Sequence, residues 1–564
     1  GQIHGRHSAR AKAVDDPVSA SQTGGSRPDF HNALIPTPSL AKRGIPQAPA
    51  AVRMGGIAGA ALAGLTYLAT RIYLQRHVGS HGTGLLQYDS YYPLAFAREL
   101  KREGSWLLFQ NPFGSLDSAP GLFNGPAILA RATYPLWNGH LLAYDLVVGT
   151  LLSILAGWWF GRLAFRLSRQ DAEITLVVVA FVIVGGGADY LFTTLTDGLG
   201  GLTAPLIWAS QWGVPWSANN LSSWEILYHA IFWGGLYAIV CGSRRGGVAA
   251  AIALAVLHPF TLVIYGLAAG AFAVHGRLAP DASTPPQRAA ALASLVVAVI
   301  GAAAWGLIAP AVSNDGAFFR DVYDRGFVIG AKELALFLLP AALLVATFFA
   351  NRDRETGLRS SAAPWLVASA LPLVVIGFAY RYLPFIPQPA HWTRVYPLAF
   401  LALAALAVPT AGRRSATAAV AMGLLVVGML DSAIANFDMG GDARLGAAPV
   451  ALSPDSARLI DKLDGLPTRK VVYVRSCGRA AAGPELEYSI AALTDQKPPF
   501  GHVYFSPRLS ARVAATRDCG TRPRVPLDAY VVIDASAVSA WPERKRRWRF
   551  GHFVLLDALT SAAT

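Results

Sequence analysis

A polar, aromatic segment runs from Tyr88 to Asn124, directly after the first membrane-length apolar run, and it opens on a carboxylate, Asp89. Asp89 stands where the chain leaves the apolar run, which puts it at the surface of a membrane. A carboxylate there can accept a proton from a hydroxyl group or orient that hydroxyl for attack. The structural alternative is a helix-terminal carboxylate that pairs with Arg98 or another base. Position alone does not separate the two interpretations.

Basic side chains that could hold a phosphate gather in a later segment, YRYLPFIPQPAHWTRVYP, between two apolar runs. They are Arg381, His391 and Arg394. A phosphate at a membrane surface needs cationic or strong donor partners. Arg394, at the expected start of a helix, is the best single candidate. The structural alternative is an arginine that extends toward lipid headgroups, as is common at helix ends.

Four further ionisable side chains lie within or beside apolar runs: His258 in LHPF, Glu225 and His229 in WEILYHAIFW, and Asp189 in GGGADY. Ionisable groups inside a bilayer usually face a cavity or a partner. A lone histidine is nevertheless more often a structural hydrogen-bonding group, and the sequence does not rank these four. Asp117, a second carboxylate after Asp89, stands in SLDSAPG, which is also an ordinary turn.

Cofactor signatures are missing at convincing spacing: there is no Walker A, Rossmann, zinc or Ser-His-Asp pattern. A divalent metal ion is the one cofactor that stays open, because Asp89, Asp117 and Glu225 could converge. Their spacing does not require a metal.

The composition predicts a membrane protein. Hydrophobic residues make up 53% and charged residues 15% of the 564 residues, whereas a soluble domain averages about 25% charged residues. The net charge of +14 comes largely from arginines at the ends of apolar runs and in both tails. Orientation in the membrane and contact with anionic lipids explain this charge better than nucleic acid does.

Ten apolar runs approach the roughly 20 residues that cross a bilayer, so we expect a polytopic α-helical membrane protein with about eleven transmembrane helices. The runs lie near 54–74, 141–165, 174–195, 221–241, 247–274, 289–312, 334–350, 362–380, 395–408 and 417–434.

The arginines predict the orientation. The basic tail at 1–53 has no apolar period and is expected to be disordered and cytosolic, which places Asp89 outside. The run at 247–274 is ambiguous, since it is either one helix or a hairpin broken at His258-Pro259. We prefer the hairpin, because it keeps Arg352, Arg413 and Arg414 cytosolic and puts the segment containing Arg394 on the same side as Asp89.

Three parts follow from this topology: the tail at 1–53, a transmembrane domain at 54–434 and a soluble extracytosolic α/β domain at 435–564. In the last part KVVYV, AYVVID and HFVLLD read as strands and ELEYSIAAL as a helix. An extracytosolic location also allows a Cys477–Cys519 disulfide. The basic cluster at 544–549 reads as a solvated charged edge.

The segment after Asp89 also predicts two short helices. In the first, at 93–103, Leu94, Phe96, Ala97 and Leu100 share one face opposite charged residues, the pattern of a helix at a membrane interface. The second spans 126–134.

With this loop architecture, and with Tyr88-Asp89 followed by Tyr91 and Tyr92, the chain resembles the C-type glycosyltransferase (GT-C) superfamily. The resemblance implies transfer of a sugar from a polyprenyl-phosphate donor to a glycan or lipid acceptor, at the outer face of a bacterial-type inner or plasma membrane. Asp89 is then the catalytic carboxylate. The carrier phosphate is held by Arg394, with help from His258, His391 and Arg381.

The same resemblance implies a substrate cavity near the loop and an acceptor-recognising C-terminal domain. The candidate residues of the substrate cavity are Tyr88, Tyr91, Tyr92, Asp117, Glu225 and His229. Three alternatives stay open: a ligase or polymerase of lipid-linked glycans, a transporter or flippase, and a non-catalytic subunit of a larger complex. A transporter usually shows internal repeats, and we find no self-similar halves.

Overall fold

In a computed structural model of the protein, the residues that the structure describes all lie between Ile45 and Thr564. The described ranges are 49–78, 91–106, 109–110, 120–121, 125–138, 140–185, 187–197, 223–312, 331–353, 358, 361–379, 382, 395–410, 414–444, 454–475, 484–498, 525, 528–542, 544 and 546–557.

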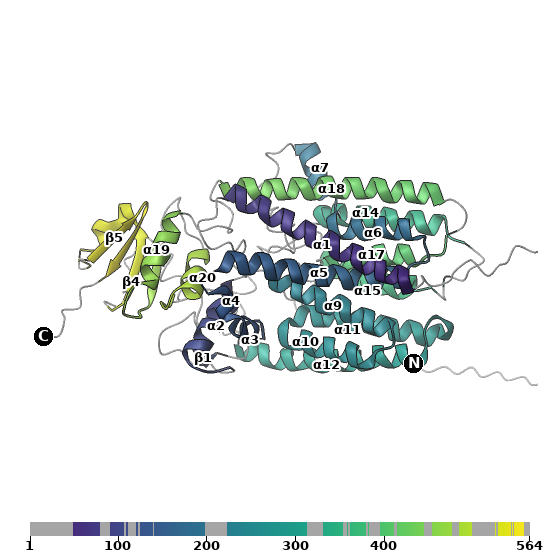
Figure 1. The fold of residues 1–564 in the computed structure, drawn as a ribbon, viewed down its shortest axis with the longest axis horizontal. Coiled ribbons are helices and arrows are strands. Elements are labelled where there is room, and N and C mark those ends of the chain that lie inside the picture. Colours follow the sequence, from purple (N-terminus) through teal and green to yellow (C-terminus); the bar gives the residue numbers. More distant parts are fainter. Residues whose placement is uncertain are drawn as a thin grey trace, which may run out of the picture. The chain divides into compact units, whose positions relative to one another are not determined.

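The structure is mostly helical, with a small sheet near the C-terminus (Figure 1). The bundle helices are α1 (Pro49–Val78), α5 (Leu141–Leu167), α6 (Ala172–Val184), α7 (Asp189–Asp197), α9 (Ser223–Val240), α10 (Arg244–Leu257), α11 (Pro259–Leu278), α12 (Pro285–Val312), α14 (Ala331–Ala350), α15 (Ala363–Ala379), α17 (Val395–Ala407) and α18 (Arg414–Arg444).

Among the described residues, five helices are long and apolar enough to cross a membrane, and six if the bent pair α6 and α7 forms one span. Four more apolar helices are shorter: Glu225–Val240, Leu334–Ala350, Ala363–Ala379 and Val395–Ala407. These helices fit membrane insertion, but the expected number of about eleven spans is not confirmed.

Helices α1 and α5 pack along a seam of glycines. Gly55 and Gly59 on α1 face Gly161 and Gly157 on α5, and a Cβ added to Gly59 would collide with the carbonyl oxygen of Gly157. Small residues at four-residue spacing let helix backbones approach closely where lipid provides no hydrophobic drive. The seam fixes α1 and α5 beside each other.

The apolar run at 247–274 forms two helices that break at His258, as the hairpin interpretation predicts. The hydroxyl of Tyr265, in the middle of α11, donates to the carbonyl of Gly247 near the start of α10 (3.0 Å). Helix α11 therefore runs back along α10, and α12 lies beside both (Figure 1). Pro259 lacks a backbone donor and fits the first turn of a new helix.

Three arginines at or near the ends of apolar runs, Arg162, Arg169 and Arg352, share one end of the bundle. The guanidinium of Arg162 lies over the ring of Tyr237 near the end of α9. The backbone N–H of Arg169 donates to the carbonyl of the second-last residue of α17. The backbone of Arg352 forms an isolated antiparallel β-bridge with Thr410, just beyond α17. This clustering is what the positive-inside rule requires, while the side of the membrane stays a prediction.

The expected loop helices are present as α2 (Tyr91–Arg102) and α3 (Gly125–Ala132), followed by the short α4 (Tyr134–Trp137). Between α2 and α3 lie two short antiparallel strands, β1 (Phe109–Gln110) and β2 (Pro120–Gly121). The apolar face of α2 is buried: Leu94, Phe96 and Leu100 are at most 2% exposed. This face therefore packs against protein, including α3 and the C-terminal helix α20, rather than against lipid.

The C-terminal unit at 454–557 contains a four-stranded sheet in the order β3-β4-β6-β5. Its elements are α19 (Pro454–Asp464), β3 (Val472–Arg475), α20 (Pro484–Leu493), β4 (Tyr530–Asp534), β5 (Arg546–Phe550) and β6 (Phe553–Asp557). Strands β3 and β4 are parallel, and the other pairs are antiparallel. Leu459 and Leu463 of α19 and Ile490 of α20 pack on one face of the sheet.

The expected strands and helix of this unit are present, and α19 and β5 are additions. The basic cluster forms β5, an edge strand whose arginines 546, 547 and 549 are mostly exposed, as a charged edge would be. Arg544 differs: it is fully buried, and its guanidinium donates to the carbonyl of Ala529. Helix α18 continues through residue 435 to Arg444.

Candidate functional site

Four side chains from three bundle helices form a hydrogen-bonded series, which we call the polar chain: His229 of α9, Tyr396 of α17, and Thr261 and His258 at the start of α11. Nδ1 of His229 lies 2.9 Å from the Tyr396 hydroxyl, which lies 3.5 Å from Oγ1 of Thr261. Oγ1 of Thr261 lies 2.7 Å from Nδ1 of His258. His229, Tyr396 and Thr261 are buried, and His258 is half-buried.

His258 is held by the local geometry of the helix break. Its Nδ1 accepts the backbone N–H of Thr261 (3.3 Å) and so caps the first turn of α11. Nδ1 acts as an acceptor there, so in the neutral ring the proton is on Nε2. Any contact of His258 with a phosphate must therefore be made through Nε2. The structural role that the sequence suggested for a lone histidine is real.

Aromatic rings enclose the polar chain. Tyr228 stacks on His258 with ring centroids 4.3 Å apart and planes 13° apart. Phe232 packs on Tyr396 at 4.4 Å, and both residues are buried. In such an apolar shell an unsatisfied polar group is costly, so the hydrogen bonds fix the three helices relative to one another.

The polar chain unites two of the predicted site residues, His229 and His258, and sequence reasoning missed the group that joins them. Tyr396 was recognised only as a neighbour of Arg394, and Thr261 was not recognised. The available signal was Tyr396 two positions after a candidate phosphate ligand, in a run that is otherwise apolar. Glu225, also predicted, lies one helical turn before His229 on α9, with a half-buried side chain.

Most of the other predicted site residues lie outside the described residues: Asp89, Arg394, His391, Arg381, Tyr88, Asp117, Cys477 and Cys519. Tyr91 and Tyr92 form the first turn of α2. Asp89 thus stands two positions before α2, and Arg394 directly precedes α17, the helix of Tyr396.

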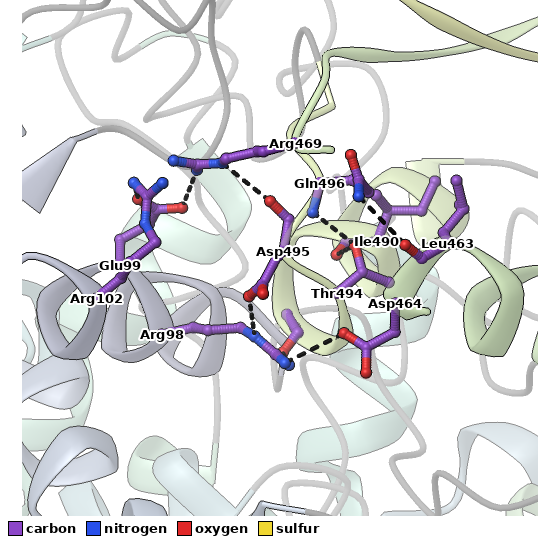
Figure 2. A network of polar contacts seen from close by, with 11 residues as sticks. Arg98, Glu99, Arg102, Leu463, Asp464, Arg469, Ile490, Thr494, Asp495 and Gln496 are labelled. Atoms are coloured by element: carbon purple, nitrogen blue, oxygen red, sulfur yellow. Dashed lines mark hydrogen bonds and ion pairs between the residues drawn. The ribbon is translucent and has the colours of Figure 1, made fainter. Parts of the chain in front are cut away.

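A second polar cluster joins α2 to the C-terminal unit, and we call it the junction (Figure 2). The guanidinium of Arg98 lies 3.3 Å from Oδ1 of Asp464 and 3.3 Å from Oδ1 of Asp495. Arg469 donates through Nε to the backbone carbonyl of Asp495 (2.9 Å) and pairs with the carboxylate of Glu99. Two charged side chains of α2 are thereby tied to two turns of the C-terminal unit.

Glu99 is the buried carboxylate of the junction and is 7% exposed. It pairs with Arg102 of α2 as well as with Arg469. Burial raises the pKa of Glu99 to about 7, against the lowering effects of Arg102 and Lys497. Glu99 is one of the charged residues that the sequence places opposite the apolar face of α2. It is buried because the C-terminal unit covers this charged face.

The junction also bears on Asp89, for which pairing with Arg98 was the structural alternative. Arg98 is engaged by Asp464 and Asp495, and it donates to the carbonyl of Ala492 (3.4 Å). Its described partners all come from the C-terminal unit. The start of α2 lies two positions after Asp89. It is held in place because the junction anchors the polar face of α2 and protein packing anchors its apolar face.

A buried ion pair in the bundle was not foreseen. Arg71 of α1 and Asp145 of α5 approach to 3.0 Å, and both side chains are 1% exposed. The Tyr67 hydroxyl accepts from Nε of Arg71 (3.1 Å) and donates to the backbone carbonyl of Asp145 (3.1 Å). The signal was present as Tyr67 and Arg71 at four-residue spacing on an apolar helix. Like the glycine seam, this pair links α1 to α5.

Within the described part of the chain, no group of three or more His, Cys, Asp or Glu residues could hold a metal ion. Of the three carboxylates considered for a divalent metal, only Glu225 is described.

No protein-family model matches this chain, and no curated protein matches it.

Proposed function

We propose that this chain is a membrane glycosyltransferase of the GT-C type, which transfers a sugar from a polyprenyl-phosphate donor to a glycan or lipid acceptor. One observation supports this most: α2, which begins two residues after Asp89, is held between α3 and the C-terminal unit. A loop that served only as a linker would not need an anchor on both faces. A catalytic loop needs one, because a reacting group must be held in place.

In this proposal Asp89 accepts the proton of the acceptor hydroxyl, or orients that hydroxyl, as its oxygen attacks the anomeric carbon. The bond from that carbon to the phosphate oxygen breaks, and the polyprenyl phosphate leaves with the bonding electrons. An oxocarbenium-like transition state gains from a nearby carboxylate. The departing phosphate gains from positive charge and strong donors.

Arg394 is the proposed charge partner of that phosphate, and His258 adds a donor through Nε2. Support comes from the polar chain, since Tyr396 lies two residues after Arg394 and is linked through Thr261 to His258. The start of α17 and the start of α11 are thus held together, which would bring an arginine and a histidine to one phosphate. Tyr396 is a positioning residue here.

The proposed location is a bacterial-type plasma membrane, with the tail at 1–53 in the cytosol and the C-terminal unit outside. The arginines gathered at the opposite end of the bundle support it. Single cysteines near Ser476 should react with a membrane-impermeant maleimide in intact spheroplasts. Labelling only after permeabilisation would reverse the orientation.

The activity test compares three variants of the purified full chain with radiolabelled prenyl-phosphate sugars as donors. Asp89→Asn keeps the shape but removes the base, so turnover should fall by about 10² or more. Arg394→Ala should lower both carrier binding and rate, because a charge-assisted contact is lost. Asp281→Asn is the control, since Asp281 is exposed beyond the end of α11. Full activity in Asp89→Asn would remove the assignment.

A second candidate is ion-coupled transport, which one observation favours. Helices α6 and α7 are bent by 65° at a glycine-containing break, and transporters often bind ions at such breaks. Uptake of a labelled polyprenyl-phosphate sugar into proteoliposomes, without transfer to an acceptor, would favour this candidate over the enzyme.

A further inference from the structure

The break between α6 and α7 brings two acidic side chains together beside α18. Helix α6 ends at Val184, and α7 begins at Asp189 after a short turn that contains Gly185 and Gly187. Asp431 of α18 lies against this turn, and α7 contacts α18 at the top of Figure 1. Asp189 is 5% exposed and Asp431 is fully buried.

Part of Asp431 has a structural role. Its Oδ1 accepts the backbone N–H of Leu191 (2.9 Å), so it caps the first turn of α7 from another helix. The remaining oxygen, Oδ2, is buried without a hydrogen-bond partner, and the same is true of Oδ1 of Asp189. Capping therefore does not account for two of the carboxylate oxygens.

These two oxygens point at one place. A Cβ added to Gly187 would lie 3.0 Å from Oδ1 of Asp189 and 3.0 Å from Oδ2 of Asp431. The same Cβ would lie 3.1 Å from Cδ2 of Phe337, so the position is too tight for a side chain, and both oxygens face the backbone of Gly187 across it. The Ser432 hydroxyl donates to the carbonyl of Gly185 (3.4 Å) in the same turn, so further oxygen atoms lie nearby.

The charge of this pair needs compensation. Among the described residues, no ion pair involves Asp189 or Asp431. The start of α7 supplies only about half a positive charge. Buried ionised carboxylates are costly unless a cation or a proton neutralises them. Two unpaired oxygens aimed at one space are suited to a cation, because hard cations prefer oxygen ligands.

We propose that Asp189 and Asp431 bind one hard metal cation in the space beside Gly187. The carboxylates supply charge, and the Gly185 carbonyl and the Ser432 hydroxyl are neutral oxygens of the same region. Carboxylate, carbonyl and hydroxyl oxygens suit Mg²⁺, Ca²⁺ or Na⁺. Such a cation would fix α7 to α18. The site is independent of the proposed sugar transfer.

The test measures cation binding to the purified full chain after chelator treatment. Mn²⁺ followed by electron paramagnetic resonance serves as the probe for a magnesium-type site, and ⁴⁵Ca²⁺ and ²²Na⁺ serve for the other two cations. We expect one of the three to bind with one equivalent per chain and to raise the unfolding temperature.

Three variants make the result specific. Asp431→Asn keeps an oxygen for the Leu191 N–H but removes a charge, and we expect it to weaken binding by about 10- to 100-fold, the scale seen when even an outer partner of a metal is lost. Gly187→Ala fills the space and should weaken binding with both carboxylates intact. Asp171→Asn is the matched control, because Asp171 stands at the N-cap position at the other end of α6 and is exposed.

Binding lost in both Asp431→Asn and Gly187→Ala, but kept in Asp171→Asn, supports the proposal, provided that size-exclusion chromatography shows the variants folded. Absence of one-equivalent binding by all three cations overturns it, as does binding that Asp431→Asn leaves unchanged. A protonated carboxyl band in the infrared spectrum at neutral pH, removed by Asp431→Asn and insensitive to all three cations, would identify a shared proton instead and would also overturn it.

Discussion

The polar chain and the junction both fix helices that are distant in sequence, but they do so with different chemical groups. The polar chain uses neutral groups, two imidazoles and two hydroxyls, inside an apolar shell. The junction uses guanidinium and carboxylate groups between α2 and the C-terminal unit (Figure 2). The Asp464 and Asp495 side chains are 46% and 63% exposed there.

The difference follows from solvent. Neutral hydrogen bonds are cheap to bury and costly to leave unmade, so they suit the bundle interior. Exposed charge pairs gain little net free energy, because water screens them and they cost side-chain entropy. The polar chain should therefore contribute more to stability per contact. The junction should set where α2 lies without contributing much to global stability.

The largest effect should come from the polar chain. Tyr396→Phe removes the hydroxyl that bonds His229 and lies near Thr261, and it should destabilise the full chain by about 1–3 kcal/mol, the cost of stranding buried polar groups. Thermal and denaturant unfolding in detergent measure this. Tyr382→Phe is the control, because Tyr382 is 83% exposed and should change stability by less than about 0.5 kcal/mol. Equal effects of the two substitutions would contradict the role given to the polar chain.

A smaller effect is expected at the buried part of the junction. Glu99→Gln keeps the shape but replaces two ion pairs, with Arg102 and Arg469, by neutral hydrogen bonds. We expect a loss of about 1 kcal/mol, seen as faster hydrogen exchange in α2 and α20 rather than as a lower global unfolding temperature. Glu103→Gln serves as the control, because Glu103 lies just beyond the end of α2 and pairs with Arg102. Unchanged exchange in α2 would show that the junction does not hold this helix.

The exposed part of the junction should contribute less. In a double-mutant cycle, Arg98→Ala and Asp464→Asn should show a coupling free energy of about 0.2–1 kcal/mol, as exposed pairs do. Local exchange of α2 is again the measurement. The cycle of Tyr396→Phe and His229→Ala measures the corresponding coupling free energy in the polar chain. A larger coupling between Arg98 and Asp464 than between Tyr396 and His229 would reverse the expected order of the two regions.

The smallest expected effect is that of salt concentration, and it distinguishes the polar chain from the junction most simply. Raising the ionic strength from about 0.1 M to about 1 M shortens the screening length from about 10 Å to about 3 Å. Protection of α2 against exchange should then fall slightly in the wild-type chain and less in Arg98→Ala. The penalty of Tyr396→Phe should not change with salt, since that region carries no formal charge.

Local patterns predicted much of the secondary structure. The spacing of Leu94 and Leu100 indicated the apolar face of α2, and both residues are buried. The alternation and β-branched content of the C-terminal segments indicate strands, and strands β4 and β6 form there. Pro259 directly after His258 indicated where one apolar run divides into two helices. Each of these signals depends on a few adjacent residues.

The sequence by itself thus indicated several of the helices and strands, and where one apolar run breaks, because backbone propensity and hydrophobic periodicity are local. Only the tertiary structure decided that His229 meets Tyr396, that Glu99 is covered by Arg469, and that Asp431 faces Asp189. These partners are 167, 370 and 242 residues apart. Nothing in the local chemistry of a buried acid or imidazole specifies a distant partner, since that choice depends on how the packed helices align.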